Sequence, residues 1–123
     1  MVLIIEDDED TLEIYREFLE MLEFEVAVAS TGAQALDAVR ARVPDAVLLD
    51  LTLPDADGRE LCDRLRAIVA PHPLAIMALT GHTLVGAERA KFDAVLRKPV
   101  DLDAVAEWLR KFERAPATPD TAG

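Results

Sequence analysis

Short apolar runs of strand length alternate along this chain with segments of helical periodicity. None of these runs is long enough to span a membrane. Strands that alternate with helices indicate βαβ units, whose right-handed crossovers build a parallel sheet with helices on both faces. The runs expected to form strands are residues 2–5, 24–29, 46–49, 74–79 and 94–97. The alternation therefore predicts an α/β fold with a five-stranded, parallel, doubly wound sheet.

Capping residues and apolar spacing place helices between these runs. Asp10 or Thr11 is expected to cap a first helix that extends to about Leu22, and Asp101 is expected to cap the last helix. Residues 83–91 have only a thin apolar pattern, so we expect a short or irregular fourth helix. The apolar residues expected to form the buried face of the first helix are Ile14, Phe18, Met21 and Leu22.

Composition narrows the class of protein. A chain of 123 residues with 51% hydrophobic residues suits one domain with its own core, which we expect to end near residue 114. A net charge of −11 disfavours binding to nucleic acid or to an anionic membrane surface. The single cysteine, Cys62, and the lack of a leader pattern predict a reducing, cytoplasmic location. Residues 115–123 lack an apolar pattern and are expected to form a disordered tail.

Four of the predicted strands lead into residues suited to binding a cation or a phosphoryl group. The first strand leads into the acidic residues 6–8, the third into Asp50, the fourth into Thr80 and the fifth into Lys98. Because the carboxyl ends of parallel strands share one edge of a sheet, we expect these side chains to meet there. The sequence therefore predicts a site for a divalent cation and a phosphoryl group.

Asp50 is the candidate phosphoryl acceptor, because a carboxylate held at the end of a buried strand can form an acyl phosphate. The incoming group adds negative charge to an acidic cluster, so a magnesium ion is needed to offset the repulsion. We predict Asp7, Asp50 and the backbone carbonyl of Thr52 as its ligands, with Glu6 holding a metal-bound water if the acidic pair directly follows the strand.

Two further groups are expected to contact the phosphoryl group. The Lys98 ammonium would pair first with Asp50 and then with a phosphoryl oxygen. Thr80 would offer its hydroxyl to the same group. Because three acids stand in a row after the first strand, the residues alone leave open whether Glu6 and Asp7 or Asp7 and Asp8 form the acidic pair.

Four motifs in order resemble the receiver domain of bacterial response regulators. They are Ile4–Ile5–Glu6–Asp7–Asp8, the stretch from Asp50 to Gly58 with Pro54, Leu79–Thr80–Gly81, and Lys98–Pro99. The resemblance covers about residues 1–114 and implies a flavodoxin-like fold, Mg²⁺ binding, and phosphorylation of an aspartate by a histidine kinase or phosphotransfer protein. It also implies an unknown downstream protein target, favours Glu6 with Asp7 as the acidic pair, and implies a cis Lys98–Pro99 peptide bond.

Two departures from the receiver pattern keep other functions open. Receivers usually carry an aromatic residue three positions before the lysine, where this chain has Val95, and the stretch from Thr80 to Lys98 is shorter than is typical. Both departures suit an alternative, a receiver-like interaction module that works without phosphorylation. An aspartyl phosphohydrolase is disfavoured because Thr52 stands where that class needs a second acid. We therefore predict a phosphorylatable receiver of a two-component phosphorelay, free-standing or part of a hybrid histidine kinase, and not an enzyme beyond weak self-phosphorylation and self-dephosphorylation.

Overall fold

Five parallel strands form one sheet in the computed structural model, which describes residues 1–112. The strand order is β2-β1-β3-β4-β5. The prediction of a five-stranded parallel sheet is confirmed, although β2 begins two residues later than expected and β4 extends to Thr80. The bounds of the strands are β1 (Val2–Ile5), β2 (Val26–Ala29), β3 (Ala46–Asp50), β4 (Ala75–Thr80) and β5 (Ala94–Arg97).

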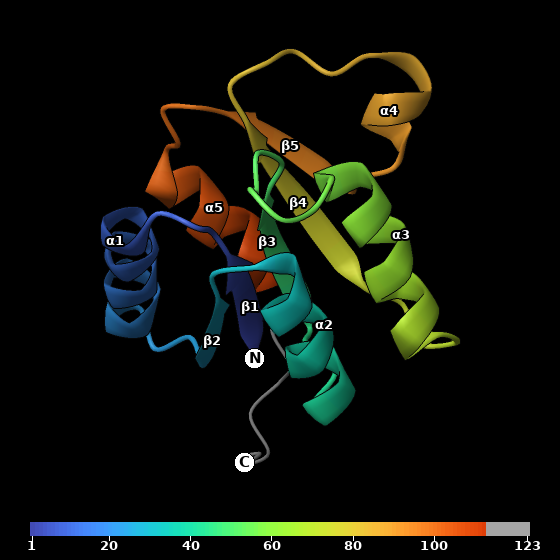
Figure 1. The fold of residues 1–123 in the computed structure, drawn as a ribbon. Coiled ribbons are helices and arrows are strands. Elements are labelled where there is room, and N and C mark those ends of the chain that lie inside the picture. The colour runs from blue at the N-terminus through green and yellow to red at the C-terminus, as the bar shows by residue number, and fades with distance from the viewer. Residues whose placement is uncertain (113–123) are drawn as a thin grey trace.

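Helices cover both faces of the sheet, with α1 and α5 on one side and α2 and α3 on the other (Figure 1). Their bounds are α1 (Glu9–Met21), α2 (Gly32–Ala41), α3 (Gly58–Val69), α4 (Gly86–Ala90) and α5 (Leu102–Leu109), followed by the 3₁₀ helix η1 (Arg110–Phe112). Asp101 caps α5 as predicted. None of the helices within residues 1–112 is long and apolar enough to cross a membrane. The predicted domain end at residue 114 and the predicted tail, residues 115–123, lie outside the described residues.

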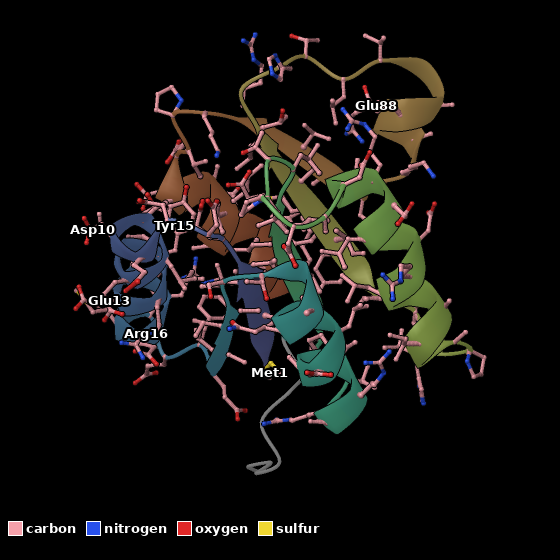
Figure 2. The ribbon with its side chains drawn as sticks, viewed as in Figure 1. Met1, Asp10, Glu13, Tyr15, Arg16 and Glu88 are labelled. Carbon is pink, nitrogen blue, oxygen red and sulfur yellow. The ribbon has the colours of Figure 1, made fainter. Side chains whose placement is uncertain are left out.

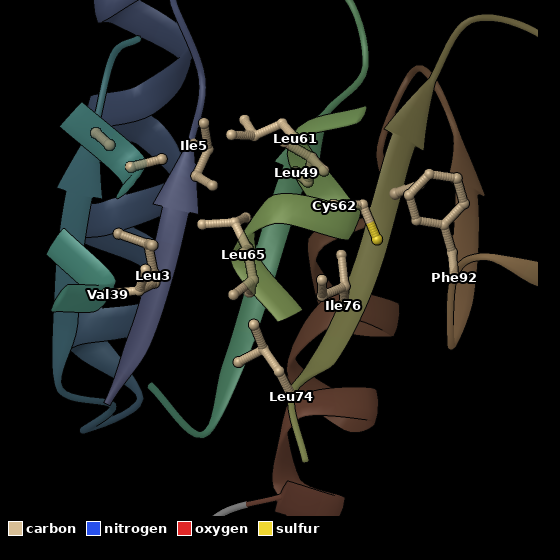
Figure 3. Close-up of a cluster of buried hydrophobic side chains, with 14 of the residues drawn as sticks. Leu3, Ile5, Val39, Leu49, Leu61, Cys62, Leu65, Leu74, Ile76 and Phe92 are labelled. Atoms are coloured by element: carbon tan, nitrogen blue, oxygen red, sulfur yellow. The ribbon is translucent and has the colours of Figure 1, made fainter. Parts of the chain in front are cut away.

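Each face of the sheet carries its own apolar core. Strand residues alternate between the two cores, so that Leu3 and Ile5 of β1 face α2 and α3 whereas Val2 and Ile4 face α1 and α5. Because both faces are covered, the central strands are continuously apolar. The core beneath α2 and α3, shown in Figure 3, includes Leu49, Leu61, Cys62, Leu65 and Ile76.

Asp8, not Asp10 or Thr11, is the N-cap of α1. Its carboxylate Oδ2 accepts hydrogen bonds from the Thr11 backbone N–H at 2.9 Å and from the Thr11 hydroxyl at 2.6 Å. The prediction was wrong because several adjacent acids can cap a helix, and the chain direction after β1 selects the first that reaches an open N–H.

The buried face of α1 also differs from the prediction. Tyr15 and Leu19 are buried, whereas Ile14 is 57% exposed and Met21 is 81% exposed. Figure 2 shows Tyr15 on the sheet side of α1 and Glu13 on the outer side. Of the predicted residues, Phe18 is partly buried and packs against the core that contains Tyr15 and Leu19, whereas Leu22 is exposed like Ile14 and Met21. The apolar residues of this segment thus form two overlapping stripes, and packing buries most deeply the one that carries the tyrosine.

The fourth helix has five residues, which confirms the prediction of a short element. Two ion pairs join its segment to α3, in addition to two apolar side chains that enter the core beneath α3. Glu88 pairs with Arg59, and the Lys91 Nζ lies 2.8 Å from the Asp63 Oδ2. Glu88 is labelled on α4 in Figure 2, where α4 lies beyond the N-terminal end of α3. The buried apolar side chains of residues 81–93 lie near the two ends of the segment and are Leu84 and Phe92.

Candidate functional site

The carboxyl ends of three strands bring acidic and amine side chains into one pocket. Glu6 and Asp7 follow β1, Asp50 is the last residue of β3, and Lys98 follows β5. These four residues line a common pocket together with Thr52. The structure thus brings together all the residues selected from the sequence except Thr80, which is not part of the pocket lining.

Asp50 is almost fully buried, with 1% of its surface exposed. Its Oδ2 accepts a hydrogen bond from the Lys98 Nζ at 3.1 Å, and its Oδ1 accepts from the Thr52 backbone N–H at 2.9 Å and from the Thr52 hydroxyl at 2.8 Å. Burial raises the pKa of Asp50, but the hydrogen bonds from Thr52, Glu6 and Lys98 outweigh it and hold the pKa below its usual value. The carboxylate is therefore ionised at neutral pH.

Glu6 is also buried but lies in a less favourable environment. Its Oε2 accepts from the Asp8 backbone N–H at 3.1 Å, whereas its buried Oε1 accepts no hydrogen bond from any donor within residues 1–112. The pKa of Glu6 is raised to about 7, chiefly by burial. The neighbouring Asp50 adds to the rise, whereas the Asp8 N–H and Lys98 oppose it. A group of this kind can hold a proton shared with Asp50 or exchange it for a cation.

The donor set suits a small, hard dication. One oxygen each from Glu6, Asp7 and Asp50 lies within 4.8 Å of the others. Magnesium prefers such oxygen ligands, and the unpartnered Oε1 of Glu6 is the atom that would gain most from a nearby cation or its water. The Asp8 carboxylate is bound to Thr11 at the start of α1 instead. Of the two acidic pairs left open by the sequence, Glu6 and Asp7 is therefore the pair beside Asp50.

The loop after Asp50 is anchored at both ends. Gly58 begins α3 so close to the chain that a Cβ atom there would lie 2.8 Å from the Leu51 Cα. Asp57 caps α3, because its carboxylate accepts a hydrogen bond from the Arg59 N–H at 2.8 Å. The Asp55 carboxylate accepts from the Gly32 N–H at 2.9 Å, at the N-terminus of α2. Sequence reasoning missed Asp55, because its partner lies far away along the chain.

Thr80 lies at the end of β4, beside β3, with 1% of its surface exposed. Its hydroxyl oxygen accepts a hydrogen bond from the His82 backbone N–H at 3.0 Å, so it is engaged with the following turn. A contact with a phosphoryl group on Asp50 would require this hydroxyl to turn toward the pocket. On the neighbouring strand β5, the Lys98 backbone N–H donates to the Thr80 carbonyl oxygen at 2.8 Å. The Lys98–Pro99 peptide bond that follows is cis, as the sequence resemblance implied.

Residues 2–110 match the family described as the response regulator receiver domain. The chain belongs to this family. The match includes every residue of the pocket described above and confirms the resemblance inferred from the four motifs. The protein is thus a receiver domain of the kind found in two-component response regulators, and its parallel sheet and flanking helices are those of the family's fold.

Full-length regulators are among its relatives. Regulatory protein LuxO from Vibrio vulnificus (strain YJ016) is 34% identical over 128 residues, which cover 97% of this chain and 28% of LuxO. Response regulator MprA from Mycolicibacterium vanbaalenii is 33% identical over 126 residues, which cover 99% of this chain and 54% of MprA. The chain therefore spans less than two thirds of the length of either relative.

Solved structures share the fold. The CheY-like response regulator receiver domain from Methylobacillus flagellatus is 35% identical, with a TM-score of 0.83 over 91% of this chain and 97% of that one. Response regulator TrrA from Thermotoga maritima, solved in complex with Mg²⁺-BeF, has a TM-score of 0.80 over the same shares of the two chains. At 23% identity, the likeness to TrrA shows the fold alone.

Proposed function

We propose that this domain accepts a phosphoryl group on Asp50 from a histidine kinase or a phosphotransfer protein, with Mg²⁺ held by Glu6, Asp7 and Asp50. The observation that carries the proposal is the environment of Asp50. This carboxylate is buried, kept ionised, paired with Lys98 and adjacent to two further carboxylates. A buried anion whose neighbours are both a cation and other anions suits a nucleophile that must accept a second negative group.

The transfer follows from these contacts. An Asp50 carboxylate oxygen attacks the phosphorus of a phosphohistidine, forming a P–O bond while the P–N bond breaks and its electron pair returns to the imidazole nitrogen. Lys98, already on the Asp50 Oδ2, offsets the charge of the new phosphoryl oxygens. The two donors of Thr52 keep the Oδ1 fixed during the approach. Bound magnesium would supply the remaining charge neutralisation.

The donor set and one structural neighbour support the metal. Glu6 is the natural site for a metal-bound water, because its Oε1 faces no donor within the described residues. Asp7 lies exposed at the mouth of the pocket, where a cation can reach it. TrrA, which has the same fold, was solved with Mg²⁺-BeF. The Thr52 carbonyl stays a predicted ligand, since the contacts of this residue in the structure are those of its N–H and hydroxyl.

An interaction module that works without phosphorylation is the second candidate. It is favoured by the five-residue α4 and by Val95, which has no ring to report a change at Asp50. Such a module would retain the fold and its surfaces, but its partner binding would not depend on the state of Asp50. The pairing of the buried Asp50 with the partly exposed Lys98 favours the phosphorylated receiver, because a surface for protein contact does not require this pair.

Intact-mass measurement after incubation with acetyl phosphate and MgCl₂ tests the proposal. We expect a labile phosphoryl adduct on the wild type that is absent with EDTA and absent in Asp50→Asn. Asp57→Asn is the matched control, because Asn caps a helix as well as Asp does and this residue lies outside the pocket. An adduct that persists in Asp50→Asn contradicts the assignment, and a wild type without any adduct would favour the interaction module.

A further inference from the structure

The turn after Thr80 is held from two sides. On one side, the His82 backbone N–H donates to the Thr80 hydroxyl oxygen at 3.0 Å. On the other side, the Arg97 guanidinium donates from Nη2 to the Gly81 carbonyl oxygen at 3.2 Å and from Nη1 to the Thr83 hydroxyl at 3.2 Å. Arg97 is the strand partner of Thr80 in the β4–β5 pairing, so its side chain is well placed to bridge this turn. We call residues 81–83 the Thr80 turn.

Little else in the described residues fixes the Thr80 turn. All three of its residues are exposed, and the first buried side chain after it is Leu84. Val85 is 71% exposed, and the helix that follows has no side-chain cap. Arg97 forms no ion pair within residues 1–112, so its guanidinium is committed to the turn alone. Within residues 1–112, the side-chain hydrogen bonds that hold the turn therefore come from two groups, the Thr80 hydroxyl and the Arg97 guanidinium.

We propose that Arg97 is a positioning residue that couples the state of Asp50 to the Thr80 turn. This inference rests on the proposed function. A phosphoryl group on Asp50 presents acceptor oxygens to which the Thr80 hydroxyl can donate its proton. Because Thr80 is not among the residues that line the pocket, its side chain has to turn to reach them, and this draws the hydroxyl oxygen away from the His82 N–H. The turn then rearranges, and the acceptors of Arg97 at Gly81 and Thr83 move away from the guanidinium.

Arg97 thereby supplies a link that Val95 lacks. The two residues lie two positions apart on β5 and point to the same face of the sheet. Val95 is half-buried and packs against the core beneath α3, and a β-branched side chain has little freedom at χ1. The long guanidinium at residue 97 instead reaches the turn directly. In the phosphorylated state the released guanidinium and the rearranged turn form a new surface at the β4–β5 edge.

Linkage determines the sign of the effect. Hydrogen bonds that exist only in the unmodified state oppose the modified state, so removing them should tighten the binding of a phosphoryl analogue. Simple electrostatics predicts weaker binding of the analogue instead, because removing the Arg97 cation near the pocket weakens the attraction for an anion. The two explanations for any effect of Arg97 can therefore be separated by its direction.

Titration with beryllium fluoride in MgCl₂, followed through backbone amide NMR signals, provides the test. We expect Arg97→Gln to lower the Kd about threefold to tenfold, as expected for the loss of exposed hydrogen bonds. Thr83→Val, which removes one acceptor and no charge, should act in the same direction with a smaller effect. The matched control is Arg64→Gln, since the Arg64 side chain on α3 forms no hydrogen bond or ion pair within residues 1–112. Its Kd should equal that of the wild type.

The amide signals give a readout that a merely structural role would not change. Saturating the wild-type protein with beryllium fluoride should shift the amide signals of Gly81, His82 and Thr83. In the ligand-free Arg97→Gln variant, the same signals should already be displaced toward their positions in the saturated wild type. Unchanged or weaker binding in both Arg97→Gln and Thr83→Val overturns the inference. So do wild-type turn signals that stay unmoved at saturation. If all variants form the phosphoryl adduct and bind beryllium fluoride with equal Kd values, the coupling through Arg97 is refuted but the proposed function is not. If the wild type forms no adduct with acetyl phosphate, the proposed function itself is refuted.

Discussion

At the residue scale, the two buried carboxylates that meet at the pocket, Glu6 and Asp50, lie in different environments. Lys98 and Thr52 contact Asp50, and these contacts keep the Asp50 pKa low. Among the described residues, the Asp8 N–H is the one donor to Glu6, and the pKa of Glu6 is raised to about 7, chiefly by burial. The two buried acids therefore divide their roles, with Asp50 ionised as the acceptor and Glu6 able to exchange a proton for a cation.

The raised pKa of Glu6 predicts how stability depends on pH in EDTA. Below its ordinary value of 4.5 the group is neutral in both states, and between 4.5 and about 7 the folded state keeps a proton that the unfolded state releases. The contribution of Glu6 to stability is therefore lost as the pH rises through 7. The free energy of unfolding of Glu6→Gln, measured by thermal denaturation, should therefore rise relative to the wild type as the pH increases. The difference should reach about 1–3 kcal/mol at pH 8. A difference that is the same at pH 5 and pH 8 would refute this.

Replacement of adjacent acids distinguishes the metal ligands. Asp7→Asn should abolish the rise in melting temperature that MgCl₂ gives the wild type. By mass action, excess MgCl₂ should add about 1–3 kcal/mol to the free energy of unfolding of the wild type. Asp8→Asn removes the same charge one residue later and retains a helix cap, so it should keep the rise. Differential scanning fluorimetry with NaCl at matched ionic strength measures both. Loss of the rise in Asp8→Asn, with Asp7→Asn unaffected, would mean that the metal ligands were assigned one residue too early.

At the element scale, α1 shows how packing selects among apolar residues. Ile14 and Met21 are no less apolar than Leu19, yet only Leu19 is fully buried. The choice depends on how the helix lies against β1 and α5, which local periodicity does not specify. The segment around α4 shows the converse, because its weak apolar pattern correctly predicted a short helix that contacts α3 through ion pairs.

The burial of α1 predicts very unequal costs for substitutions that look similar in sequence. Leu19→Ala should lower the free energy of unfolding by about 2–5 kcal/mol, because it leaves a cavity in a closed core. Ile14→Ala on the exposed face should change it by less than about 0.5 kcal/mol. Urea denaturation of the two variants measures both values. Equal losses would show that the helix buries a different face in solution.

At the scale of the whole molecule, the protein folds with a net charge of −11. Most of its ion pairs involve side chains that are more than a third exposed, and such pairs contribute little. Repulsion among the unpaired acids acts over the whole surface and opposes compaction. Salt that screens this repulsion should therefore stabilise the folded state, in addition to any stabilisation by bound magnesium.

Salt should stabilise the metal-free protein. Raising NaCl from about 20 mM to about 300 mM in EDTA shortens the range of charge repulsion and should raise the melting temperature by a few degrees. Asp7→Asn should respond to NaCl as the wild type does, because its lost ligand matters only for metal. A melting temperature that falls with salt would mean that attractive ion pairs outweigh the net repulsion.

The sequence by itself determined the sheet, the chain order of its elements and the residues at its carboxyl edge. Parallel strands with covered faces must be apolar throughout, and their ends must meet at one edge, so this information is local and repeats along the chain. Asp50 and Lys98 could be selected as partners for the same reason, although 48 residues separate them.

Only the tertiary structure decided which acid caps α1, which stripe of α1 is buried, and how Asp55 and Arg97 are used. Asp55 binds the N-terminus of α2, and Arg97 bridges the Thr80 turn. Each of these depends on the direction in which a side chain points relative to an element far away in sequence. A periodic pattern constrains which positions are apolar, but the relative placement of packed elements is set by the whole core and so cannot be read from any one segment.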